Sequence, residues 1–261
     1  MTRRNTVAAL AGLITFALGG AAWAGGVSGV YDFSGTQYID DFTDIRRGTQ
    51  INAGLDLGGT EHSALNFTGS TGSAGDTWLT KFTPGGSPSV FDASCFMTAR
   101  ASVLIHPFSN KKGAGVVALL NQGLGDKGLA LIVSDAGNTD TLQLATIDPA
   151  TGKLKTLASV PLKNAIKENA WYFVLVNVVT DGDDLFVGGQ LYSHVDPGNP
   201  DSDLGGVVSL NFTGTLSGTG LKSTGHVGIV ASAVSAVVSS SVTGWAAQDD
   251  LAETESCSDP T

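Results

Sequence analysis

The chain has 261 residues, of which 42% are hydrophobic and only 15% are charged, so its composition is globular and excludes a disordered or coiled-coil protein. It contains 35 glycines, 20 aspartates and only 4 glutamates. Because aspartate and glycine favour turns and glutamate favours helix interiors, these counts predict short strands joined by tight loops, not a helical bundle. The formal net charge of −10 disfavours binding to nucleic acid or anionic lipid.

The N-terminus has the pattern of a secretory signal peptide. Arg3 and Arg4 precede an apolar run over 7–22, and Ala22-Trp23-Ala24 is a small-x-small cleavage site. The run is shorter than the ~20 residues that a spanning helix needs, although a retained anchor is the alternative interpretation. We therefore expect residues 1–24 to be removed. The mature protein would be secreted, periplasmic or at the cell surface, with no membrane span.

Two cysteines, Cys95 and Cys257, fit an exported protein. In an oxidising compartment a single structural disulfide is the default expectation, and it would join an early strand to the end of the chain. Their spacing excludes a zinc ribbon and a Cys-x-x-Cys redox site.

Strand patterns follow one another along the chain. Residues 25–89 are less regular, with strands at 64–67 and 77–80, and we assign them to the same domain as the core at 90–249. An acidic tail at 250–261 carries the second cysteine. Alternation, apolar runs and turn chemistry in the core predict strands at 91–107, 115–120, 129–133, 141–147, 153–160, 171–180, 185–194, 207–212, 227–231 and 234–245.

Turn residues place two of the hairpins. Asp148-Pro149-Ala150-Thr151-Gly152 and Asp181-Gly182-Asp183-Asp184 are turns, because proline presets φ and glycine supplies φ > 0. Between them, residues 161–169 carry Leu162, Ala165 and Ile166 at helical spacing, which predicts one short helix. The whole pattern is typical of an antiparallel sandwich or barrel.

The segment Ile166-Lys167-Glu168-Asn169-Ala170-Trp171-Tyr172, followed by a turn and a second strand, resembles laminin-G-like and other concanavalin A-like lectin/glucanase domains. The closing strands at 225–229 and 237–245 resemble the last core strands of that superfamily. The resemblance implies an all-β, antiparallel two-sheet jelly roll with one short helix. Such folds bind sugars, sometimes with calcium, and some branches cleave glycans, so the fold does not choose the function.

An enzymatic site is not evident. Glycosidases need two carboxylates flanking the bond, and the glucanase branch supplies them from a glutamate-rich strand that this chain lacks. Aspartate pairs leave a glycan-active enzyme as an alternative. No Gly-x-Ser-x-Gly occurs, and the four histidines have no metal-ligand spacing. Gly123-Leu124-Gly125-Asp126-Lys127-Gly128 matches a dinucleotide fingerprint, but a strand follows it instead of the helix that the fingerprint requires, so we interpret it as a hairpin loop.

Sugar binding needs exposed aromatic faces and convergent polar groups. Gln190 and His194 lie beside Tyr192 at the same-face spacing of two, which makes this strand a candidate. The full set of candidate carbohydrate-binding residues is Trp78, Gln190, Tyr192, His194 and Trp245. For each aromatic residue a place in the core is the competing interpretation.

Calcium is the one cofactor that the sequence suggests. The loop at 196–203 offers Asp196, Asn199, Asp201 and Asp203, and Ca²⁺ takes six to eight oxygen ligands. A second, poorer cluster lies at Asp181–Asp184. In both loops, turn geometry alone also accounts for the aspartates.

Three functions follow in order of preference. The first is an exported, non-catalytic lectin-like or adhesion module that binds a glycan or an extracellular protein surface. The second is a structural or surface protein with no specific ligand, and the third is a glycan-active enzyme that uses aspartates.

Overall fold

The computed structural model describes thirteen parts of the chain. They are residues 28–31, 42–46, 51–53, 65–69, 77–83, 90–94, 96–105, 112–135, 139–167, 170–193, 199, 201–233 and 238–249. The predicted signal peptide at 1–24, Cys95, Cys257 and the acidic tail at 250–261 lie outside them.

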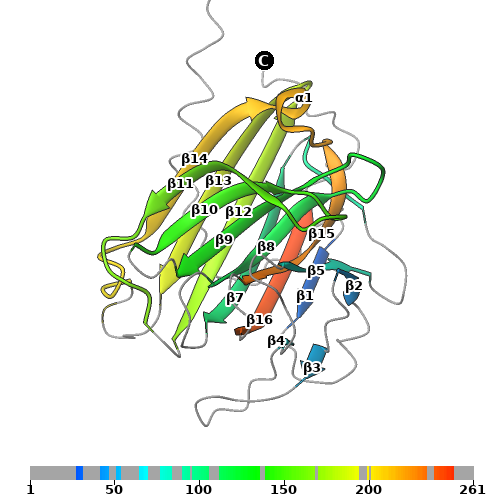
Figure 1. Cartoon of the computed structure of the whole chain (residues 1–261). Coiled ribbons are helices and arrows are strands. Elements are labelled where there is room, and N and C mark those ends of the chain that lie inside the picture. The colour runs from blue at the N-terminus through cyan, green and yellow to red at the C-terminus, as the bar shows by residue number, and fades with distance from the viewer. Residues whose placement is uncertain are drawn as a thin grey trace, which may run out of the picture.

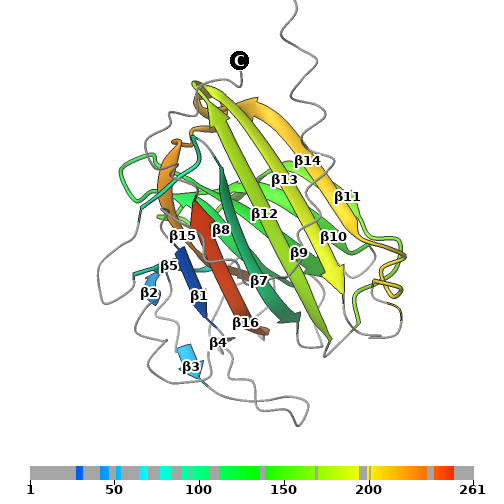
Figure 2. The same cartoon turned by 180° about the vertical axis from the view of Figure 1, so that it is seen from behind.

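Two antiparallel sheets make up the described structure. Sheet A has the order β14 (Val208–Thr215), β13 (Asp184–Ser193), β12 (Trp171–Asp181), β7 (Met97–Ile105), β16 (Val238–Asp249), β4 (Leu65–Gly69) and β3 (Ile51–Ala53), with β1 (Ser28–Tyr31) also paired to β16 (Figure 2). Sheet B has the order β11 (Leu154–Pro161), β10 (Thr141–Ile147), β9 (Gly128–Asp135), β8 (Lys112–Leu120), β15 (Thr224–Ala233), β5 (Thr77–Phe82) and β2 (Phe42–Arg46), with β6 (Phe91–Asp92) paired to β15 (Figure 1).

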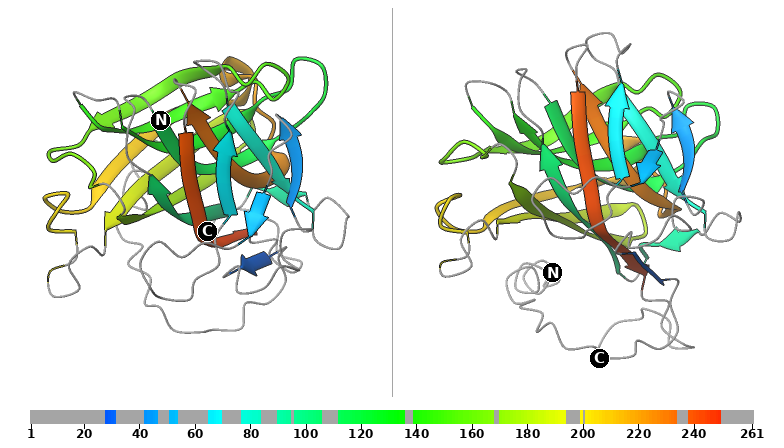
Figure 3. Two further views of the ribbon diagram at one scale, coloured as in Figure 1. Left: turned by 60° about the horizontal axis from the view of Figure 1, so that its bottom comes forward. Right: turned by 90° about the horizontal axis from the view of Figure 1, so that it is seen from below.

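The sheets form two layers, which are visible from below in Figure 3. Strands from before residue 90 join both layers, because β1 pairs with the last strand of the described chain and β5 pairs with β15. The predicted all-β sandwich of two antiparallel sheets is confirmed.

The predicted turns form the hairpins, and residues within each turn stabilise its backbone. In the β10–β11 turn, the Asp148 carboxylate accepts from the N–H groups of Ala150 and Thr151 at 2.8 and 3.1 Å. Gly152 closes the turn at φ 70°, where an L side chain is disfavoured. In the β12–β13 turn, Gly182 takes the same left-handed region at φ 59°.

The main core lies between the two layers. Alternate residues of each facing strand point into it, among them Val174 and Val176 of β12 and Leu129 and Leu131 of β9. The layers approach closely where β13 crosses β9, because a Cβ atom at Gly189 would lie 2.7 Å from a methyl carbon of Leu131.

A second core lies on the other face of sheet B. It consists of Leu79, Val117, Leu120, Ala130, Ile132, Ile147 and Val230, each no more than 1% exposed. In a flat sheet β5 and β10 would be roughly 19 Å apart, because the three strands between them leave four inter-strand spacings of ~4.8 Å. Yet the Thr77 hydroxyl on β5 donates to the Gly152 carbonyl oxygen just after β10, at 3.0 Å. Sheet B therefore curls over its own outer face and encloses that face.

The short helix is present but not where the sequence predicts it. Residues 162–167 are not helical, because their N–H groups bond elsewhere: Leu162 donates to the Asp140 carbonyl oxygen and Ile166 to the Asp140 carboxylate. The helix is α1, Leu216–Thr219, which begins after the N-cap Thr215 and ends at Gly220, φ 74°.

Candidate functional site

The outer face of sheet A is the surface that the two cores leave open. On β12 and β13 the inward residues are buried and the outward ones are half-buried, whereas the outer face of sheet B is closed by the second core. The face is seen in Figure 2, where β13, β12 and β7 lie side by side. Large side chains and amides gather on this face, which makes it the candidate ligand-binding surface.

An aromatic pair stands at the centre of this face. Phe173 on β12 lies directly opposite Tyr192 on β13, and their rings meet edge to face with centroids 5.9 Å apart. The Tyr192 hydroxyl donates to the Gln190 side-chain oxygen at 2.6 Å. The structure thus brings together two of the predicted carbohydrate-binding residues, Gln190 and Tyr192, and adds an aromatic neighbour.

Arg100 on β7 extends the aromatic pair by one strand. The guanidinium carbon lies 5.7 Å from the centroid of the Phe173 ring, which is a cation–π contact. Arg100 is opposite Leu175 on β12, and Leu175 in turn is opposite Gln190 on β13. Arg100, Phe173, Tyr192 and Gln190 therefore form one continuous surface across three strands.

A gap in the side chains continues this surface toward β14. Gly188 lies between Asn177 on β12 and Asn211 on β14, and a Cβ atom placed on it would meet only the Asn211 amide oxygen, at 3.8 Å. Space is therefore open above the Gly188 backbone, with an amide on either side. We call the set Arg100, Phe173, Asn177, Gly188, Gln190, Tyr192 and Asn211 the sheet A patch.

The Tyr192 phenol is held in its protonated form. Burial raises its pKa above the usual value, and the negative charge of Asp201 adds to this effect. At neutral pH the hydroxyl is therefore a hydrogen-bond donor. A sugar oxygen can accept from it in competition with Gln190.

Two of the predicted calcium ligands, Asp201 and Asp203, instead accept hydrogen bonds that hold the loop in place. Asp201, in the left-handed region at φ 61°, accepts from the Ser193 N–H at the end of β13. Asp203 accepts from the Tyr172 hydroxyl at 3.1 Å through one oxygen, while its other oxygen is buried and has no partner. Both carboxylates therefore fasten the loop to the ends of β12 and β13.

A calcium site is not assembled in the part of the loop that can be described. Asn199 is exposed, and Asp196 lies outside the described residues. Among the residues with described side chains, no three histidine, cysteine, aspartate or glutamate groups converge as a metal site would require. Among the described residues of the loop, Asp203 has a buried oxygen without a hydrogen-bond partner.

The second aspartate cluster likewise has a structural role. The Asp183 carboxylate accepts from the backbone N–H of Ser217 at 2.9 Å and from its hydroxyl at 2.6 Å, at the start of α1. These bonds hold the pKa of Asp183 below its usual value.

Of the remaining predicted sugar-binding residues, the structure describes the backbone of Trp78 and Trp245 but not their side chains. Trp78 lies on β5 of sheet B, opposite Ala231. Trp245 lies on β16 of sheet A, opposite Tyr31 and next to a register shift. His194 lies outside the described residues.

Sequence reasoning missed Phe173, Arg100 and the two asparagines. Phe173 was hidden by the apolar character of 171–180, which favours a strand buried on both faces. Arg100 had a visible signal, because it is the single charged residue of the strand 97–105. Its relation to Phe173 depends on the pairing of β7 with β12, which a local pattern does not reveal.

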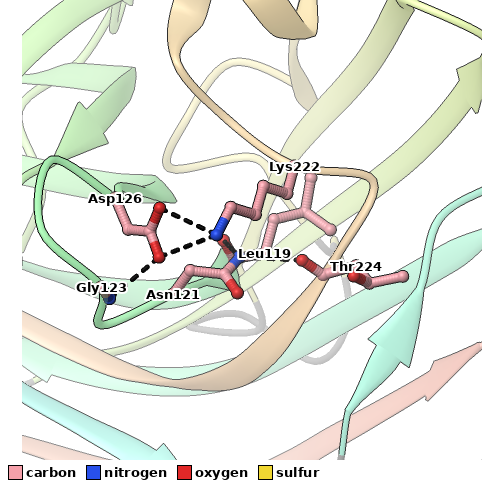
Figure 4. A network of polar contacts seen from close by, with 6 residues as sticks. All are labelled: Leu119, Asn121, Gly123, Asp126, Lys222 and Thr224. Carbon is pink, nitrogen blue, oxygen red and sulfur yellow. Dashed lines mark hydrogen bonds and ion pairs between the residues drawn. The ribbon is translucent and has the colours of Figure 1, made fainter.

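The glycine motif at 123–128 forms the predicted hairpin loop between β8 and β9, and a network of polar contacts holds it (Figure 4). The Asp126 carboxylate accepts from the Gly123 N–H and from the Lys222 ammonium, each at 2.9 Å. The Lys222 hydrogen bond is the main cause of a lowered pKa at Asp126. The Asn121 amide donates to the carbonyl oxygens of Leu119 and Thr224. The motif thus leads into strand β9, as predicted, and not into the helix that a dinucleotide fingerprint requires.

Comparison with known proteins decides the fold. Basic winged bean lectin with Tn-antigen superposes with a TM-score of 0.52 at 12% identity, over 86% of this chain and 98% of the lectin. Arcelin-5, a lectin-like defense protein from Phaseolus vulgaris, gives a TM-score of 0.52 at 13% identity, over 85% of this chain and 97% of arcelin-5. The fold is the concanavalin A-like jelly roll. Neither a family model nor a curated protein matches the sequence.

A catalytic protein also contains this jelly roll. An engineered GH43 glycoside hydrolase matches with a TM-score of 0.52 at 14% identity, over 90% of this chain but only 42% of the enzyme. The superfamily resemblance drawn from residues 166–172 is thus confirmed for the fold. At these identities the likeness carries no site residue from one protein to another. In the described residues, no helix is long and apolar enough to cross a membrane.

Proposed function

We propose that this protein is a non-catalytic lectin-like module that binds carbohydrate on the sheet A patch. The observation that carries the proposal is the half-buried pair of Phe173 and Tyr192, with the Tyr192–Gln190 hydrogen bond beside it. Aromatic faces cover the apolar C–H surfaces of sugars, and amides and hydroxyls bind their hydroxyl groups. Asn177 and Asn211 add two amides across the open backbone of Gly188.

The use of the aspartates favours binding over catalysis. Asp126, Asp148, Asp183 and Asp201 each accept from backbone N–H groups in loops, and Asp203 accepts from Tyr172. None of these carboxylates belongs to the sheet A patch. A glycosidase would need a pair of them across the bond to be cleaved.

The test measures binding of the purified protein to a glycan array and compares the wild type with two variants of Tyr192 and one of Phe173. Tyr192→Ala and Phe173→Ala should each weaken binding about tenfold or more, because buried aromatic contacts dominate such sites. Tyr192→Phe keeps the ring and should retain most of the affinity. Leu157→Ala, on the far strand β11, is the control for a general loss of stability.

Three outcomes would sink the proposal. Silence across the array would favour a structural or surface protein without a specific ligand. Binding that all four variants retain would place the glycan site elsewhere. Release of reducing sugar from a bound glycan would favour the enzymatic alternative.

Export and the disulfide belong to the same proposal. The N-terminal pattern at 1–24 supports removal of a signal peptide, so mass spectrometry of the mature protein should give a start at Gly25. A Cys95–Cys257 disulfide would leave no titratable thiol in unreduced, denatured protein. Two thiols, or an intact Met1, would contradict these expectations.

Calcium stays a prediction for the loop at 196–203. Its support is the oxygen-rich composition of the loop and the buried, unpartnered oxygen of Asp203. The involvement of Asp201 with Ser193 counts against a preformed site.

A further inference from the structure

Arg100 is the one cationic residue in the described strands of sheet A. The described outward side chains that surround it are Thr98, Phe173, Leu175, Asn177, Gln190 and Tyr192, all of them uncharged at neutral pH. The only interaction of its guanidinium with the described residues is the contact with the Phe173 ring. An arginine has five N–H donors in a planar fork, and here no carboxylate or carbonyl of the described chain takes them up.

Such an arrangement is unusual in an acidic protein. The chain carries 24 acidic and 14 basic residues, so acidic partners for a surface arginine are abundant. Among the described outward residues of β12 and β13, the aspartates are Asp181 and Asp184, at the turn between these strands. They lie ~20 Å along β12 from Leu175, the residue opposite Arg100. Asp201, in the loop beyond β13, accepts a hydrogen bond from the Ser193 N–H. The sheet A patch thus has one positive charge, at Arg100 on β7, and its residues on β12, β13 and β14 are uncharged.

Contact with Phe173 leaves the hydrogen-bond donors of Arg100 available to an anion. The ring centroid lies 5.7 Å from the guanidinium carbon and attracts the cation without taking up its N–H groups, so the planar fork can still make two parallel hydrogen bonds. Carboxylate and sulfate groups match that fork and accept bidentate bonds. The adjoining rings and amides of the patch suit the neutral part of a sugar, roughly 10 Å away across two strand spacings.

We propose that the sheet A patch selects anionic saccharides, whose carboxylate or sulfate binds Arg100 while the sugar ring lies over Phe173 and Tyr192. This inference rests on the proposed carbohydrate-binding function and names the class of sugar. Since the protein as a whole is negative and repels acidic polymers, selectivity for them would have to come from this one local cation.

The experiment uses pairs of polymers with the same sugar backbone, one acidic and one neutral. Polygalacturonate is compared with its fully methyl-esterified form, and dextran sulfate with dextran, by calorimetry or affinity electrophoresis of the full mature chain. We expect the wild type to bind one acidic polymer at least about tenfold more tightly than its neutral counterpart, and the pair that shows the preference identifies the anion. Arg100→Gln should abolish the preference, and Arg100→Lys should retain part of it because it keeps the charge without the fork.

A matched control separates a site from general charge effects. Lys155→Gln removes the same charge from an exposed position on β11 of the other sheet, and it should leave the preference unchanged. Equal weakening by Arg100→Gln and Lys155→Gln would overturn the inference, because binding would then follow net charge. Circular dichroism and thermal unfolding check that each variant is folded, and Arg100→Lys serves if Arg100→Gln is not.

The two proposals fail in different ways. If the wild type binds neutral and acidic polymers alike, and Tyr192→Ala still abolishes binding, the inference about anions is wrong and the carbohydrate site stands. If no polysaccharide binds at all, both are wrong.

Discussion

Replacing Tyr172 with phenylalanine tests the buried contact that joins β12 to the loop at 201–206. Tyr172 is 1% exposed, and its hydroxyl accepts from the Lys167 N–H at 2.6 Å while it donates to Asp203 at 3.1 Å. The other oxygen of Asp203 has no partner, so the phenol is the one hydrogen-bond donor to this carboxylate within the described structure. A hydrogen bond to a charged group contributes about 1.5–3 kcal/mol. The exposed Lys167 can turn its N–H to water and adds little.

Tyr172→Phe should therefore lower the free energy of unfolding by about 1.5–3 kcal/mol, measured in urea with an unchanged m-value. The control is Tyr192→Phe, which removes a hydroxyl bonded only to the neutral Gln190 side chain in a half-buried place. Its cost should be smaller, about 0.5–1.5 kcal/mol.

Alkaline pH provides a second measurement on the same variant. Burial, followed by the negative charge of Asp203, raises the pKa of Tyr172 well above its ordinary value. Because the unfolded chain then releases this proton first, at about pH 10, the stabilisation is complete below that pH and decreases as the pH rises above it. The difference between wild type and Tyr172→Phe should shrink above about pH 10. A loss below ~0.5 kcal/mol at neutral pH, or a difference that does not change up to pH 11, would refute the role given to this hydroxyl.

Three further predictions concern other parts of the fold. The hydrogen bonds with Ser217 lower the pKa of Asp183, so their stabilisation is present above the unfolded pKa of about 4 and is lost as the pH falls through the lower folded pKa. The urea midpoints of wild type and Asp183→Asn should therefore differ at pH 7 and converge in acid. A difference that stays constant with pH would contradict this. Gly115→Ala would place a Cβ atom 1.9 Å from the Leu131 carbonyl oxygen and should destabilise by about 3 kcal/mol or more, whereas Gly188→Ala, with open space, should unfold like the wild type; equal effects would refute the packing argument. Millimolar calcium should raise the melting temperature relative to a chelator if the loop at 196–203 binds it, and an unchanged value removes the calcium prediction.

The strands and hairpins could be predicted because their signals are local. The Asp148–Gly152 turn needs only its own carboxylate and one glycine, and the alternation of 141–147 is visible in seven consecutive residues. The prediction of a helix at 161–169 was wrong, because apolar residues at helical spacing also occur in a coil. That coil is held by Asp140, which lies at the far end of the preceding hairpin and leaves no trace in the segment itself.

The candidate site was only half visible for a related reason. Gln190 and Tyr192 share one strand, so their spacing of two places them on one face without any knowledge of the fold. Phe173, Arg100 and Asn211 join them through the pairing of β7, β12, β13 and β14, whose registers depend on contacts far apart in the sequence. The curl of sheet B, which leaves sheet A as the open face, likewise depends on a contact between Thr77 and Gly152.

The edge strand β11 of sheet B affects whether the protein can self-associate through its sheets. Within the described sheets β11 is hydrogen-bonded to β10 alone, so the other side of its backbone pairs with no described strand and is open to pairing with another chain. Its sequence opposes this, because Lys155 is exposed on it, its pairing with β10 is interrupted by a register shift near Leu144, and it ends at Pro161, which has no N–H to offer. The sandwich therefore ends at β11 with an edge that resists edge-to-edge aggregation.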